Sequence, residues 1–418
     1  MSAFELLPEG GRPTSPGAEA FWWPTSSGST TTVVADTGAW LGSLGVMPPP
    51  AIDLVRIAAG AYMADRRSPR GSSFTRTIDL HVQLVESEPF RDAIDEIADL
   101  LFWLTGDAWS LALSDDGLAA PDPSDNAPAR VGTVALLSGG LDSFCGAVLA
   151  GADDRLFLGH WDSPTVKGAQ NRVKAWLDTA LEGGVEYQQL RIVQSEQKCE
   201  SSSRSRALLF MALTAAIAEA RGAALGEIPE NGYTSLNPPL GPERGGALST
   251  RSTHPLTVAR FNRLLRRLGL RVRLSDPYVA MTKGQLVKLV SDLAVPNFGT
   301  GIAETLSCGK LDGGRYRGGN PNHHCGLCFP CIVRRGAIAT AGVPDDTPYL
   351  SNTLTGAALT QLRSNRSTDV AAVRRALESG FSDEILIAMG PFPPAYDLDS
   401  AFGLCVAGLA ELARVDLG

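Results

Sequence analysis

The stretch that decides the predicted fold is Leu136-Leu137-Ser138-Gly139-Gly140-Leu141-Asp142-Ser143. An apolar run, Val134 to Leu137, leads into it, as expected of a buried strand. Apolar side chains at helical spacing lead away from it, namely Leu141, Phe144, Cys145, Val148 and Leu149. The order of strand, glycine-rich turn and helix predicts a doubly wound parallel sheet of the α/β class.

A turn in this position is suited to bind a phosphate. The following helix presents free backbone N–H groups and its positive dipole end, and glycine lets an anion approach the main chain. The hydroxyls of Ser138 and Ser143 can add donors, and Asp142 is placed to hold magnesium. The Gly-Lys-Ser/Thr of a Walker loop is absent. The pattern resembles the Ser-Gly-Gly-x-Asp-Ser of PP-loop ATP pyrophosphatases; the alternative is a turn that binds nothing.

Composition narrows the class of protein. The 418 residues are 44% hydrophobic and 20% charged, which is typical of a soluble globular chain. A net charge of −8 argues against a protein that coats nucleic acid. We see no signal peptide, and the most apolar stretch, Ala207–Ile217, is too short to span a bilayer. Four of the seven cysteines lie between Cys308 and Cys331, which favours metal binding in a reducing compartment. The prediction is a cytoplasmic protein without membrane contact.

Three regions differ in their patterns. Residues 1–125 predict an N-terminal α+β domain whose first 30 or so residues are irregular. Residues 131–345 alternate strand and helix patterns, as a parallel sheet with crossovers does. Residues 350–418 predict a helical C-terminal extension. The arginine-rich helix over 258–270 is interpreted as a solvated face rather than an RNA contact.

Polar residues follow several predicted strands of the central region. His160 ends one strand, Glu230 follows another, and Arg204 and Arg206 open the apolar helix. Because ligands bind at the carboxyl ends of strands in such sheets, we expect these side chains near the glycine-rich turn. Guanidinium groups suit phosphate oxygens. The alternatives are helix-start arginines that face solvent and an ordinary turn at Glu230.

Lys283 begins a helix that a capping box at Thr282 and Gln285 introduces. A lysine at a helix N-terminus opposes the helix dipole. We therefore interpret Lys283 as facing a phosphate or a carboxylate.

The cysteines Cys308, Cys325, Cys328 and Cys331 predict a closed tetrahedral zinc site. Zinc would order the Gly/Asn-rich loop between residues 310 and 322, which has little apolar area to bury. An iron–sulfur cluster is the alternative. Cys145, Cys199 and Cys405 are predicted to be free thiols.

These motifs, in this order, resemble the QueC family of 7-cyano-7-deazaguanine synthases over roughly residues 131–340. The resemblance implies that ATP adenylates the carboxylate of 7-carboxy-7-deazaguanine, that ammonia then forms an amide, and that the amide is dehydrated to a nitrile. The residues predicted to bind ATP and Mg2+ are Ser138, Gly139, Gly140, Leu141, Asp142, Ser143, His160 and Arg206. Catalytic roles are predicted for Asp142, Lys283 and Arg204, and Zn2+ is predicted on the four cysteines.

The chain departs from the family at the residues expected to handle the acceptor. The family's Tyr-Gly-Gln is His160-Trp161-Asp162 here, its Arg-Asn is Arg206-Ala207, and its Tyr-Pro-Asp-Cys is Ser252-Thr253-His254-Pro255. The enlarged layout is similar to QueC-like proteins of bacterial anti-phage systems of the Qat and CBASS types. That similarity implies a protein amine from the same operon as an acceptor in place of ammonia.

Two other functions remain open from the sequence. One is a PP-loop sulfurtransferase acting on tRNA, which would need reactive cysteines outside the metal cluster, where Cys145 and Cys199 are candidates. The other is a scaffold that binds a nucleotide or a partner protein without catalysis. The intact Asp142 argues against the scaffold.

Overall fold

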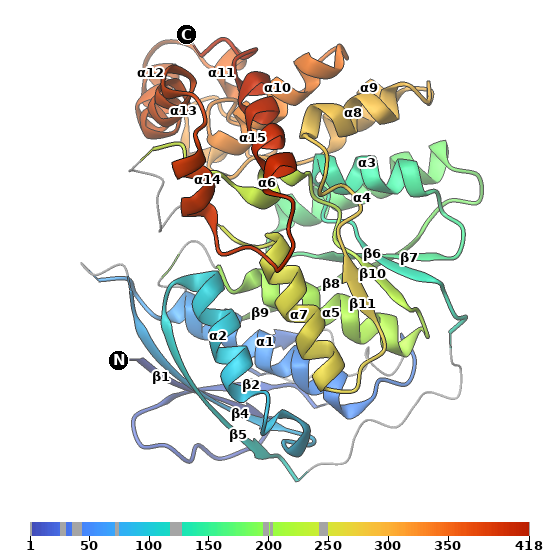
Figure 1. The fold of residues 1–418 in the computed structure, drawn as a ribbon, viewed down its shortest axis with the longest axis vertical. Helices are drawn as coiled ribbons and strands as arrows, with labels where there is room; N and C mark the ends of the chain where they lie inside the picture. The colour runs from blue at the N-terminus through green and yellow to red at the C-terminus, as the bar shows by residue number, and fades with distance from the viewer. Residues whose placement is uncertain are drawn as a thin grey trace.

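The computed structural model describes residues 2–25, 31–35, 44–71, 75–117, 128–194, 200, 204–241 and 250–417. Two parallel sheets and a helical C-terminal region form an α/β fold, which confirms the predicted class (Figure 1). No helix within these residues is both long and apolar enough to cross a membrane.

The N-terminal unit is built on a four-stranded sheet in the order β2-β1-β4-β5. Its elements are β1 (Ser2–Pro8), β2 (Glu19–Trp23), β3 (Val33–Ala35), α1 (Pro49–Arg67), β4 (Thr77–Leu84), α2 (Ile94–Thr105) and β5 (Ala108–Asp115). Every strand pair in this sheet is parallel. The expected mixture of strands and helices is present, and it consists of parallel crossovers rather than segregated layers.

The expectation that the first 30 or so residues are irregular is wrong for Ser2–Pro8 and Glu19–Trp23, which form β1 and β2, while residues 26–30 lie outside the described residues. β1 lies between β2 and β4 and buries Phe4, Leu6 and Leu7. Its apolar run is only a few residues long and stands beside segments rich in proline and glycine, so composition hides it. Pairing on both edges and cover from α1 stabilise the strand.

The central sheet has the order β11-β10-β6-β7-β8, and all its pairs are parallel, as predicted. Its strands are β6 (Thr133–Leu136), β7 (Arg155–His160), β8 (Glu186–Leu190), β10 (Leu225–Glu227) and β11 (Arg273–Ser275). The chain runs outward from β6 to β8 and then crosses to β10 on the other side of β6. In such sheets a ligand crevice opens where the strand order reverses, which here is the carboxyl end of β6.

Helices cover both faces of the central sheet (Figure 1). The helices of this region are α3 (Leu141–Ala150), α4 (Pro164–Ala180), α5 (Arg206–Ala220), α6 (Gly232–Leu236), α7 (Pro255–Arg267), α8 (Lys283–Ser291), α9 (Phe298–Glu304) and α10 (Phe329–Ala341). One apolar cluster joins α3 and α4 to α8 and α9 on one face. A second cluster joins α5 and α7 to α1 and α2, so the N-terminal unit shares a core with the other face.

The predicted buried helix is confirmed as α5, in which nearly every residue from Ala207 to Ala218 is buried. It packs against α1 of the N-terminal unit. A short antiparallel pair between β3 and β9 (Ile192–Gln194) also connects the two regions. Arg263 and Arg267 of α7 are about half exposed or more, as predicted, and pair with Glu96 of α2. Arg260 of the same helix is partly buried, with its guanidinium carbon 5.5 Å from the centre of the Trp103 ring.

The C-terminal region is helical, as predicted, and lies over α8 and α10 (Figure 1). Its helices are α11 (Leu350–Thr353), α12 (Gly356–Asn365), α13 (Ser367–Ser379), α14 (Asp383–Met389) and α15 (Leu398–Leu412). Helix α15 approaches α10 closely at Gly336, which has no side chain. A Cβ at this position would lie only 2.5 Å from the Glu411 carbonyl oxygen.

Candidate functional site

The glycine-rich turn joins β6 to α3 at the predicted switch point. Gly139 has a φ of +83°, and a Cβ there would meet Gln170 of α4 at 3.1 Å, so the position requires glycine. The Ser143 hydroxyl donates to the Gly140 carbonyl at 3.1 Å and lies 3.1 Å from the Ser138 hydroxyl. The turn therefore presents two hydroxyls beside the free N–H groups at the start of α3.

Asp142, in the first turn of α3, forms a buried ion pair with Lys283 at the start of α8. The Nζ of Lys283 lies 2.5 Å from Asp142 Oδ2, and the same oxygen accepts a hydrogen bond from Asn231 Nδ2 at 2.9 Å. Burial disfavours the charged carboxyl, but the Lys283 ammonium and the hydrogen bonds lower the pKa of Asp142 to about 2. The sequence places these two residues on separate helices, and the fold brings their charges into contact.

Glu230 completes a small charged cluster at the end of β10. Its Oε1 lies 3.9 Å from Lys283 Nζ. Burial and the neighbouring Asp142 carboxylate raise the pKa of Glu230 well above its usual range. One carboxylate of the cluster is thus held ionised, and its neighbour is pushed toward the protonated form.

A cavity of about 330 Å³ opens over the turn and the charged cluster, within the range of about 300–1,000 Å³ that small-molecule sites occupy. Its lining includes Ser138, Gly140, Leu141, Asp142, Ser143, Glu230, Lys283, Ser307, Phe329 and Val333. The structure therefore gathers most of the predicted loop residues and Lys283 at one place. Gly139 contributes through its backbone, whose carbonyl accepts a hydrogen bond from Leu306 N–H at 2.7 Å.

His160, Arg204 and Arg206 do not line this cavity. His160 is buried, and its Nε2 lies 3.0 Å from the Ile192 carbonyl. Burial and the Arg206 charge lower the pKa of His160 to about 3. Arg204 donates to the Thr105 carbonyl at 2.9 Å, and Arg206 lies 3.5 Å from Asp162. In the structure the N-terminal unit supplies the partner of Arg204, whereas Arg206 pairs with Asp162, which follows β7. The sequence alone reveals neither partner.

Glu411 of α15 holds the start of α8 beside Lys283, and no sequence pattern indicated this role. Its carboxylate accepts hydrogen bonds from the Gly284 N–H at 3.1 and 3.0 Å and from the Thr282 hydroxyl. The predicted capping box between Thr282 and Gln285 is present as well. A negative charge at the start of α8 offsets the unfavourable placement of Lys283 against the helix dipole. Only long-range packing could reveal this partner, which lies 127 residues from Gly284.

We expect Glu411→Gln to lower the free energy of unfolding by about 2 kcal/mol, because a hydrogen bond to a charged group contributes roughly that much. Urea unfolding followed by circular dichroism would measure the change. Glu378→Gln is the matched control, since Glu378 lies exposed on α13. Equal stability of the two variants would show that Glu411 does not hold the start of α8.

The four predicted cysteines converge on one point. Their sulfur atoms all lie within 4.8 Å of one another, and the four residues are buried. The Cys308–Cys328 and Cys325–Cys331 sulfur pairs are 3.9 and 3.8 Å apart. A tetrahedral ion with bonds of about 2.3 Å requires sulfur atoms about 3.8 Å apart. The cluster therefore has the donor set and the spacing to bind zinc.

The cysteine cluster is connected to the glycine-rich turn. Arg334 of α10 is fully buried and donates to the Thr305 hydroxyl and to the Ile302 carbonyl, each at 2.6 Å. These bonds hold the segment that runs through Leu306, which contacts Gly139, to Cys308. Loss of the structure around the cysteine cluster can therefore displace the glycine-rich turn, because Leu306 lies close to Cys308 in the sequence.

The remaining described cysteines are poor nucleophiles. Burial raises the pKa of the Cys145 thiol strongly and that of Cys405 to about 12. Cys199 lies outside the described residues. The buried Cys145 offers no support for the sulfurtransferase alternative.

Part of the chain is similar to curated 7-cyano-7-deazaguanine synthases. That of Rhizobium johnstonii is 41% identical over 78 residues, which are 19% of this chain and 27% of that protein. That of Porphyromonas gingivalis is 37% identical over 78 residues, which are 19% of this chain and 29% of the relative. That of Ralstonia pickettii is 32% identical over 82 residues, which are 20% of this chain and 31% of the relative.

The chain thus spans less than a third of the length of these relatives. No protein-family model and no solved structure matches it. The resemblance predicted from the sequence is confirmed over this part, where the chain is QueC-like.

Proposed function

We propose that the chain is an ATP-dependent ligase that adenylates a 7-deazaguanine carboxylate and then forms a C–N bond. The observation that carries the proposal is the buried Lys283–Asp142 pair, which lines the same cavity as the Ser138–Ser143 turn. The pair puts a cationic donor beside the anion-binding turn, where negative charge develops during phosphoryl chemistry. The QueC-like segment supports the choice of substrate.

In this mechanism a carboxylate oxygen of the acid attacks the α-phosphorus of ATP, and the bond to the β-phosphate oxygen breaks. The N–H groups at the start of α3 and the hydroxyls of Ser138 and Ser143 would hold the departing pyrophosphate. Lys283 would stabilise charge on the transferred phosphate. An amine nitrogen then attacks the acyl carbon, AMP leaves, and the nitrogen loses a proton.

Asp142 fits the predicted magnesium ion. Its Oδ1 is buried and finds no hydrogen-bond partner among the described residues, whereas Oδ2 is occupied by Lys283 and Asn231. A carboxylate oxygen is a ligand that Mg2+ prefers. Bound there, the ion would neutralise charge on the phosphates.

We assign this chemistry to residues 131–345, and we place the reaction in the cytoplasm. Residues 1–125 and 350–418 would form the N-terminal and C-terminal units around it. The acceptor is ammonia or, as the resemblance to defence proteins implies, an amine of a protein from the same operon. Intact-mass measurement of that protein after incubation with the enzyme, ATP and the acid would detect the conjugate.

Release of AMP and pyrophosphate on addition of 7-carboxy-7-deazaguanine tests the central proposal. We expect at least a hundredfold stimulation of AMP formation by the acid, because only the acid provides the attacking oxygen. Adenine, which has no carboxylate, is the matched control compound. AMP formation that does not depend on the acid would exclude this function.

A further inference from the structure

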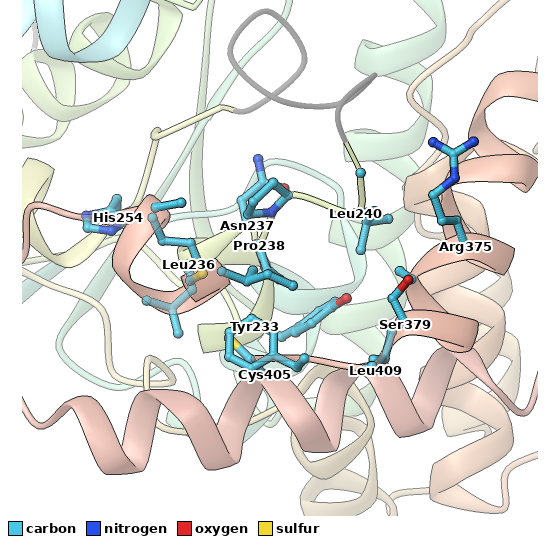
Figure 2. Close-up of a pocket in the computed structure, with 18 of the residues that line it drawn as sticks. Tyr233, Leu236, Asn237, Pro238, Leu240, His254, Arg375, Ser379, Cys405 and Leu409 are labelled. Atoms are coloured by element: carbon cyan, nitrogen blue, oxygen red, sulfur yellow. The ribbon is translucent and has the colours of Figure 1, made fainter. Parts of the chain in front are cut away.

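Figure 2 shows a second cavity, of about 490 Å³. It is lined by α6 and the chain that follows α6, by α13, α14 and α15 of the C-terminal region, and by Thr250, Arg251 and His254. Asn237 and Thr250 line both cavities, and Asn237 Nδ2 donates to the Thr250 carbonyl at 3.0 Å. The two cavities therefore share a wall that contains this polar pair.

Helix α6 connects the second cavity to the charged cluster. Asn231, its N-cap residue, donates to Asp142, and Tyr233, two residues later, lines the second cavity. The Tyr233 ring lies against α15 because position 408 is glycine: a Cβ there would come within 2.2 Å of the ring. A Cβ on Gly232 would meet the Val279 carbonyl at 1.9 Å. The wall that contains Tyr233 is thus closely packed against α15 and against the chain at Val279.

The lining indicates the charge and polarity of a ligand. Most of it is apolar, from residues such as Leu236, Leu240 and Leu409 (Figure 2). Arg251 and Arg375 are also among the lining residues, whereas none of the described lining residues is an aspartate or a glutamate. This balance of charged and apolar residues disfavours a protonated amine and favours an anion with an apolar body. The guanidinium carbon of Arg251 lies 3.8 Å from the centre of the Trp103 ring, and its Nη1 donates to the Trp103 carbonyl at 3.3 Å.

We propose that the second cavity binds the acid substrate, a planar heteroaromatic carboxylate, with the carboxylate at the Asn237–Thr250 wall. The inference rests on the proposed function and adds the position of the acid. ATP occupies the first cavity, and the carboxylate oxygen meets its α-phosphate where the two cavities adjoin. The amine acceptor approaches from outside both cavities.

Ser379→Trp tests this assignment. Ser379 is the last residue of α13, is exposed, and lines the cavity in Figure 2, so an indole there fills the cavity without entering the core. Thr368→Trp, at an exposed position on the same helix and outside the cavity, is the matched control. Calorimetry on the full chain would measure binding of 7-carboxy-7-deazaguanine and, separately, of a non-hydrolysable ATP analogue.

We expect Ser379→Trp to weaken binding of the acid at least tenfold and to change binding of the ATP analogue less than twofold. Thr368→Trp should bind both compounds as the wild type does. Unchanged affinity of Ser379→Trp for the acid would overturn the assignment, while acid-dependent AMP formation by the wild type would keep the proposed function. The assignment would also be overturned if Ser379→Trp lost amide formation but kept acid-dependent AMP formation, because the second cavity would then bind the amine acceptor. A wild type that neither binds the acid nor forms AMP would refute both.

Discussion

Lys283→Met is expected to lower ATP-dependent turnover at least a hundredfold and the free energy of unfolding by about 3 kcal/mol. The loss of turnover follows from removal of a preorganised cationic donor, which typically costs a factor of about 100–1,000. The loss of stability follows because Asp142, which is 5% exposed, would remain as a buried charge without its cation. Denaturant unfolding and AMP release with the acid measure the two effects separately.

The double variant Asp142→Asn/Lys283→Met distinguishes stability from catalysis. It removes both charges, so we expect it to recover much of the lost stability while turnover stays low. Lys288→Met is the control, since Lys288 lies exposed on the same helix and pairs only with Asp292 in the described chain. Recovery of turnover in the double variant would show that the pair has only a structural role.

The pH dependence of the pair follows from its pKa values. Because the pKa of Asp142 is lowered from 3.8 to about 2, its contribution to stability is fully present above pH 4 and is lost as the pH falls through 2. Measurements between pH 7 and 8 therefore compare fully charged wild type with each variant.

Cys331→Ser is expected to bind less than one tenth of the zinc of the wild type and to lose at least about 4 kcal/mol of unfolding free energy. A metal that binds only the folded chain stabilises it by about 4 kcal/mol when its concentration is about 1,000 times its dissociation constant. Cys331 is fully buried within the cluster, so a hydroxyl there leaves an incomplete thiolate set. Metal analysis of the purified protein and thermal unfolding provide the readouts.

Cys145→Ala is the control for this variant, because Cys145 is equally buried but lies outside the cluster. Metal analysis also separates zinc from the iron–sulfur alternative, which would give iron and visible absorbance. We further expect Cys331→Ser to weaken ATP binding, since the segment ending at Cys308 contacts Gly139 through Leu306. A zinc content equal to that of the wild type would contradict the assignment of the cluster.

The parts of the site that were predicted from sequence are local ones. The glycine-rich turn and α3 follow one another within a few residues, and Cys325, Cys328 and Cys331 are spaced by three. Between residues so close in sequence, the local backbone geometry determines which side chains can come into contact. Lys283 was singled out for a similar reason, because a lysine at a helix start is locally unfavourable.

The parts that were missed depend on contacts between distant segments. Arg204 and Arg206 have the chemistry of phosphate ligands, but the N-terminal unit gives Arg204 a carbonyl partner, and β7 is followed by Asp162, which pairs with Arg206. The cap from Glu411 depends on how α15 packs over α8. No local sequence pattern specifies these partners, since an arginine or a helix start can be paired equally well with many other polar groups in the chain.

By itself, the sequence determined an α/β chain with a phosphate-binding turn and a four-cysteine cluster, because both motifs are encoded by spacing along a short segment. Tertiary structure alone decided that Asp142 meets Lys283, that the C-terminal region caps α8 through Glu411, and that a second cavity adjoins the first. The physical reason is that burial lowers the dielectric and excludes water, so a charge is stabilised by whichever partner the packing brings near. That partner can lie anywhere in the chain.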